Sequence, residues 1–101
     1  MKLHIRSLLL VLIMGFSTVA MAHSLFIAAN ENDDGTVIAE GMYSTGGVAS
    51  GIEVRLEDVS GRVLWKGEAD ENGKVTYKRP DVPYMIIFDG GGGHMAMEEG
   101  I

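Results

Sequence analysis

Short runs of alternating hydrophobic and polar residues, separated by turns rich in Gly, Asn and Asp, dominate the chain after residue 23. The clearest run is residues 52–57, where Ile, Val and Leu alternate with Glu, Arg and Glu. A period of two predicts a β-strand with one buried face and one solvated face. No helical apolar repeat continues over a comparable stretch, so the pattern favours strands throughout.

The same pattern predicts seven short strands. They cover residues 25–29, Thr36–Tyr43, 52–57, 63–69, the segment around Val75 and Tyr77, 84–88 and 94–98. Residues 84–88 are apolar at every position, which is typical of a central strand. The number and spacing of the strands predict one all-β domain, an immunoglobulin-like sandwich. In such a small sandwich the first and last strands can lie at the same edge.

Two glycine-containing turns stand out. Asn72-Gly73 is a strong hairpin signal between the fourth and fifth predicted strands. Residues 90–93 are four glycines directly before His94. They fit either a tight bend that brings His94 close to another element or a flexible turn between the last two strands. They do not fit a phosphate-binding loop, because no helix pattern and no nearby cation follow them.

The first 22 residues form a segment of a different kind. It starts with two basic residues, continues with an apolar run at residues 8–14 and ends in the small-x-small pattern Ala20-Met21-Ala22. This organisation predicts a secretory signal peptide at residues 1–22, and the apolar run is too short to span a bilayer. We therefore expect residues 23–101 to be a periplasmic domain with no stable membrane insertion after cleavage.

The net charge limits the classes of partner that the domain can bind, and the absence of cysteine bears on its stability. Removal of Lys2 and Arg6 with the leader takes the formal net charge from −6 to −8. This charge disfavours nucleic acids and anionic lipids, which are recognised through Lys/Arg clusters, and is compatible with cations. The chain has no cysteine, so no disulfide stabilises this small domain. A metal ion that binds only the folded state would add stability.

Cleavage after Ala22 would make His23 the first residue of the mature protein. Its α-amine and ring Nδ1 can then chelate one metal ion. His94 is the other histidine that survives cleavage, and its ring would complete three nitrogen donors if the fold brings the two residues together. Such donors suit Cu, Ni, Zn and Co, and they bind only when unprotonated. The sequence thus predicts a metal site of His23 and His94 with affinity that falls below about pH 7–8.

The neighbours of His94 allow further interpretations. In an extended segment, Met95 and Met97 share one face and His94 lies on the other. We expect the Met face to pack in the core, with thioether ligation of a softer ion such as Cu(I) as the alternative. Asp89 is either an acceptor that orients the His94 ring or a solvated turn carboxylate.

Catalysis has little support in the sequence. The chain has no cysteine nucleophile, and no Ser–His–Asp grouping can be singled out. We therefore predict a binding protein rather than an enzyme.

Three features together resemble a known family. They are a histidine directly after an Ala-x-Ala signal, residues 67–77 (Gly-Glu-Ala-Asp-Glu-Asn-Gly-Lys-Val-Thr-Tyr) and residues 88–94 (Phe-Asp-Gly-Gly-Gly-Gly-His). The chain is similar in these features to the small periplasmic accessory components of nickel/cobalt energy-coupling-factor uptake transporters. Residues 67–77 also resemble carboxypeptidase-regulatory-like sandwich modules in general.

The resemblance implies a β-sandwich that binds Ni²⁺ or Co²⁺ and assists its delivery to the membrane subunits of a metal uptake transporter. It supports His23 and His94 as ligands and no other residue. Two alternatives stay open. One is a periplasmic copper-binding carrier that uses the same histidines with Met95 or Met97 as an added ligand. The other is a structural or ligand-binding β-sandwich without a metal.

Overall fold

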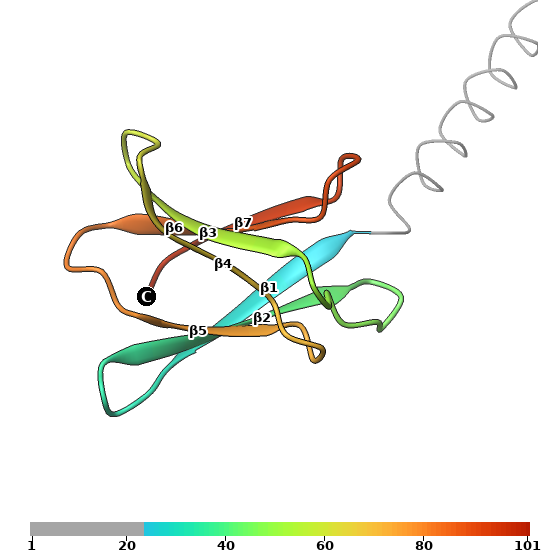
Figure 1. Cartoon of the computed structure of the whole chain (residues 1–101), viewed down its shortest axis with the longest axis horizontal. Helices are drawn as coiled ribbons and strands as arrows, with labels where there is room; N and C mark the ends of the chain where they lie inside the picture. Colours follow the sequence, from blue (N-terminus) through green and yellow to red (C-terminus); the bar gives the residue numbers. More distant parts are fainter. Residues whose placement is uncertain (1–23) are drawn as a thin grey trace, which may run out of the picture.

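The structure, a computed structural model, describes residues 24–101 and consists of two antiparallel β-sheets packed face to face (Figure 1). The strands are β1 (Leu25–Glu31), β2 (Thr36–Tyr43), β3 (Glu53–Asp58), β4 (Val63–Glu68), β5 (Lys74–Lys78), β6 (Tyr84–Asp89) and β7 (Met95–Glu99). One sheet has the order β1-β2-β5 and the other β4-β3-β6-β7. The prediction of an all-β sandwich with seven strands is confirmed.

The strand limits follow the sequence pattern closely. β2 has the predicted bounds, and the other strands shift by one or two residues at their ends. β6 lies between β3 and β7, which confirms the apolar segment 84–88 as a central strand. The predicted signal peptide, residues 1–22, and His23 lie outside the described residues. No helix within residues 24–101 meets the length and hydropathy needed to cross a membrane.

The core is formed by the inward-facing positions of both sheets. Phe88, the largest fully buried side chain, lies directly over the backbone of β2. A Cβ atom at Gly41 would be 2.6 Å from the Phe88 ring, so the absence of a side chain at Gly41 lets the two sheets approach. The other core members are Leu25, Val37, Ala39, Ala49, Val54, Leu56, Ala69, Val75, Tyr77, Tyr84 and Ile86.

The prediction of a hairpin at Asn72-Gly73 is wrong. β4 belongs to the four-stranded sheet and β5 to the three-stranded sheet, so the turn carries the chain across the sandwich. The local geometry is still a tight turn: the Asp70 side chain accepts hydrogen bonds from the backbone N–H groups of Asn72 and Lys74, at 2.8 and 3.0 Å. The sequence therefore indicated the tight turn correctly. It did not indicate whether β4 and β5 pair with each other, because that depends on the sheet to which each strand belongs.

One edge strand of each sheet lies on the same side of the sandwich. β1 is an edge strand of the first sheet, β7 is an edge strand of the second, and the two strands contact each other. The expectation that the first and last strands share an edge is confirmed.

Candidate metal site at the β6–β7 turn

His94 lies at the end of a compact turn between β6 and β7. The Gly90 N–H donates to the His94 carbonyl at 2.8 Å, and the His94 N–H donates to the Gly91 carbonyl at 2.9 Å. Residues 91–93 all have positive φ, between 58° and 86°, a conformation that glycine adopts without steric cost. The structure agrees with the interpretation of the glycine run as a tight bend. The bend leaves His94 exposed at the end of the sandwich.

An aromatic contact places His94 against the other sheet. The rings of His94 and Tyr43 have centroids 6.3 Å apart and are perpendicular, in an edge-to-face arrangement. Tyr43 is the last residue of β2 and packs partly against the core. Its hydroxyl oxygen is 3.6 Å from the position a Cβ would take at Gly90. Tyr43 thus spans the gap between the sheets, and the glycine turn lies against it.

The first described residue lies at this same end of the molecule. The Ser24 carbonyl accepts a hydrogen bond of 2.8 Å from the backbone N–H of Ser44, the residue after Tyr43. Leu25 is the register partner of Tyr43 in the β1–β2 pair. Figure 1 shows the start of β1 and the turn before β7 at the same end of the sandwich. His23, the predicted partner of His94, lies outside the described residues.

Asp89 holds the base of the turn. Its Oδ2 accepts a hydrogen bond of 3.0 Å from Arg55, and its Oδ1 accepts one of 3.1 Å from the Gly91 N–H. The Arg55 guanidinium, followed by the Gly91 N–H, lowers the pKa of Asp89 below its ordinary value. Both carboxylate oxygens are therefore engaged away from the His94 ring. The interpretation of Asp89 as a direct acceptor for His94 is not supported.

Arg55 is the centre of a larger ionic cluster on β3. Besides Asp89, its guanidinium pairs with Glu53 at 2.9 Å and Glu57 at 2.7 Å. These hydrogen bonds, with that to Glu57 the largest contribution, raise the pKa of Arg55. The cluster ties β3 to the end of β6, where the glycine turn begins.

The expectation that Met95 and Met97 pack in the core is wrong. Their side chains are 48% and 56% exposed, whereas Ala96 between them packs against the core. Ala96 is the register partner of the buried Phe88, so alternation along β7 turns Met95 and Met97 away from the core. Alternation places the two thioethers on the face opposite that of His94, so neither supports the histidine site.

Within residues 24–101, no group of three His, Cys, Asp or Glu side chains is arranged to hold a metal ion. His94 can therefore contribute one ligand from the described part of the chain. The amine and ring of His23 are the donors that the sequence predicts.

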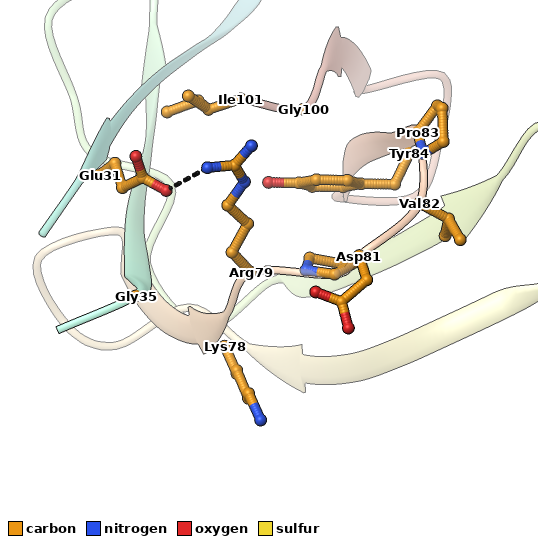
Figure 2. Close-up of a pocket in the computed structure, with 11 residues that line it drawn as sticks. Glu31, Gly35, Lys78, Arg79, Asp81, Val82, Pro83, Tyr84, Gly100 and Ile101 are labelled. Atoms are coloured by element: carbon orange, nitrogen blue, oxygen red, sulfur yellow. Dashed lines mark hydrogen bonds and ion pairs between the residues drawn. The ribbon is translucent and has the colours of Figure 1, made fainter.

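A cavity at the opposite end of the sandwich was not predicted. It has a volume of about 720 Å³ and is bordered by the segment 78–84 and by Glu31, Gly100 and Ile101. Figure 2 shows the Arg79 guanidinium between Glu31 and the Tyr84 hydroxyl. Arg79 pairs with Glu31 at 2.7 Å, and the hydroxyls of Tyr77 and Tyr84 are 3.1 Å apart. The Arg79 charge is thus balanced within the protein, and the cavity lies far along the strands from His94.

Comparison of the chain with protein families, curated proteins and solved structures finds no match. The resemblance to accessory components of nickel/cobalt transporters therefore stays a prediction from the residues. The function has to be argued from the geometry around His94.

Proposed function

We propose that this chain is a periplasmic divalent-metal-binding accessory protein that assists nickel/cobalt uptake by a membrane transporter. His23 and His94 are the proposed ligands. The observation that carries the proposal is the position of Ser24, whose carbonyl is bonded to the residue after Tyr43, while the Tyr43 ring contacts His94. His23 precedes Ser24 by one peptide unit, which separates the two Cα atoms by about 3.8 Å.

The donor chemistry suits a borderline transition metal. Signal cleavage after Ala22 gives His23 an α-amine beside its imidazole, and the His94 ring supplies a third nitrogen. Amine and imidazole nitrogens suit Ni²⁺, Co²⁺ and Cu²⁺. Because protons compete for all three nitrogens, affinity falls as the solution becomes acidic.

Exposure of His94 supports a delivery role over a storage role. The ring lies at the tip of a turn at the surface, so a ligand from a membrane subunit can approach the bound ion without unfolding of the sandwich. The turn itself is fixed by its own hydrogen bonds and by Asp89.

The decisive experiment compares two forms of the exported protein. Intact mass first establishes that the chain begins at His23, and calorimetric titration with Ni²⁺, Co²⁺ and Cu²⁺ follows. A second form carries one additional alanine before His23, which converts the amine to an amide and leaves the sandwich unchanged. We expect the extended form to bind at least about tenfold more weakly, a loss of about 1.4 kcal/mol. Equal affinity of the two forms would contradict the proposal.

His94→Ala tests the other half of the site. We expect a similar loss of affinity with an unchanged circular dichroism spectrum, because His94 is exposed and contributes no core contact. Cells that express the candidate transporter with this variant should then accumulate less ⁶³Ni than cells with the wild-type protein. Absence of tight binding of any divalent ion by the cleaved protein would favour a β-sandwich without a metal. A consistent preference for copper when all ions compete would favour a copper carrier.

A further inference from the structure

One side of the β7 backbone is open. In the part of the chain that the structure describes, β7 pairs only with β6, and β1 contacts it from the other sheet without forming a ladder. The Gly90 N–H donates to the His94 carbonyl, and an equivalent bond closes the other end of the β6–β7 ladder. Because hydrogen-bonded positions alternate along antiparallel strands, the backbone N–H and C=O groups of Met95, Met97 and Glu99 point away from β6.

The other edge strands differ from β7 in their side chains. Edge strands of natural proteins often carry a lysine or a bulge that discourages pairing with another chain. β4 carries Lys66, and its ladder with β3 contains a register shift. β5 carries Lys74 and Lys78. β1 has no lysine, but its carboxylate, Glu31, is paired with Arg79 at 2.7 Å. β7 has neither a lysine nor a register shift.

The side chains of β7 are suited to an extended basic partner. Met95 and Met97 are 48% and 56% exposed, and both carboxylates of the strand, Glu98 and Glu99, are exposed as well. None of the ion pairs within residues 24–101 includes either carboxylate. A strand added at this edge would cover the thioethers and could place a basic side chain opposite each carboxylate.

We propose that β7 binds an extended segment of a partner protein by strand addition, and that this segment has two consecutive basic residues followed by apolar residues at alternate positions. In the antiparallel arrangement the basic residues lie opposite Glu99 and Glu98, and the apolar residues lie opposite Met97 and Met95. Backbone hydrogen bonds supply affinity, and the side-chain pairs supply sequence preference. The interaction is independent of the metal site, because none of these four residues is a proposed metal ligand.

A second copy of the chain fits this edge less well. Antiparallel pairing of two β7 strands around Met97 would place Glu98 opposite an alanine and Glu99 opposite a methionine. All the carboxylates would stay unpaired, and two chains with a formal net charge of −6 would meet. A basic segment avoids both penalties, so the charge of the edge favours a different protein as the partner.

The first test uses fluorescence anisotropy with a labelled peptide that contains Lys-Lys-Leu-Thr-Leu, in EDTA so that no metal ion contributes. We expect it to bind at least about tenfold more tightly than a peptide with Glu-Glu-Leu-Thr-Leu. The double variant Glu98→Lys with Glu99→Lys should reverse this preference. Asp33→Lys with Glu71→Lys is the matched control, because it changes the net charge equally at two exposed turn positions. It should keep the wild-type preference, and loss of the preference in this control would overturn the proposal.

The second test asks which peptide N–H group contributes to binding. The N–H of the first leucine, opposite Met97, donates to β7, whereas the N–H of the threonine, opposite Ala96, points away. N-methylation of that leucine should weaken binding by at least about tenfold, and N-methylation of the threonine should change it little. Equal effects would overturn strand addition, as would absence of binding at about 1 mM peptide.

Sedimentation of the wild-type protein tests the alternative occupant. We expect a monomer. The Met97 N–H points away from β6, so Met97→Pro blocks the open edge and leaves the β6–β7 ladder bonded. A wild-type dimer that Met97→Pro converts to a monomer would assign the edge to a second copy and overturn the proposal.

Discussion

Tyr43 and His94 meet ring to ring across the two sheets, at a centroid distance of 6.3 Å and an angle of 90°. The residues are 51 positions apart in the sequence, and neither has another aromatic contact of this kind among the described residues. Edge-to-face aromatic pairs contribute about 0.5–1.5 kcal/mol beyond burial. This contact connects the glycine turn to the end of β2, beside the start of β1.

Tyr43 should therefore position His94 for metal binding. Tyr43→Phe keeps the ring and should leave Ni²⁺ affinity within about twofold of the wild type, because the aromatic contact persists. Tyr43→Ala removes the contact and should lower the affinity by roughly tenfold, the scale seen when partners that orient a ligand are lost. Calorimetry measures both variants. Equal losses in both would show that the hydroxyl group, rather than the ring, is what matters.

Asp89 should fix the turn through two separate bonds. Asp89→Asn keeps an oxygen acceptor for the Gly91 N–H and loses the ion pair with Arg55, whereas Asp89→Ala loses both interactions. We expect Asp89→Ala to reduce Ni²⁺ affinity by roughly tenfold and Asp89→Asn to reduce it less. Glu57→Gln is the control, since it changes another partner of Arg55 that does not touch the turn. A loss of the same size in Glu57→Gln would indicate a general effect of the Arg55 cluster.

The buried Tyr77 hydroxyl group should make the folded protein less stable at alkaline pH. Burial, followed by the hydrogen bond with Tyr84, raises the pKa of Tyr77. In the unfolded chain a tyrosine ionises near pH 10, so the unfolded state releases its proton first as the pH rises. The stability that depends on neutral Tyr77 is therefore complete below about pH 10 and decreases above it. Urea unfolding between pH 8 and 11 measures this decrease, and Tyr77→Phe should make it smaller. An unchanged slope in Tyr77→Phe would assign the effect to other groups.

We expect glycine to be required for stability at position 73, where the chain passes from one sheet to the other. It has a φ of 76°, and a Cβ there would be 2.8 Å from the Gly41 carbonyl oxygen and 2.9 Å from the Ala49 nitrogen. Gly73→Ala should therefore cost about 1–2 kcal/mol for the backbone conformation and about 1–3 kcal/mol more for the clash. Gly35→Ala is the matched control, with a φ of 81° and no atom within 4 Å of the new Cβ. Thermal unfolding should show the larger loss for Gly73→Ala, and equal losses would mean that the clash is relieved.

Strand positions could be predicted because burial and solvation impose alternation locally. The alternating residues 52–57 became β3 almost unchanged, and the apolar segment 84–88 became the central strand β6. The turn at Asn72-Gly73 was also visible, but its partner strands were not. A local turn signal carries no information about whether the next strand returns to the same sheet.

Met95 and Met97 show a similar limit of prediction from the sequence. Alternation alone placed Met95 and Met97 on one face of the last strand, and it gave no indication of which face would meet the core. The pairing of β7 with β6 decided that question, because it puts Ala96 beside the buried Phe88.

The sequence by itself determined the seven strands and the glycine turn before His94, because these depend on residue type and short-range periodicity. Only the tertiary structure decided that Tyr43 meets His94, that Ser24 lies at the same end and that Met95 and Met97 are exposed. Those relationships arise from the pairing of distant strands, which is set by how all the inward-facing side chains fill one core together.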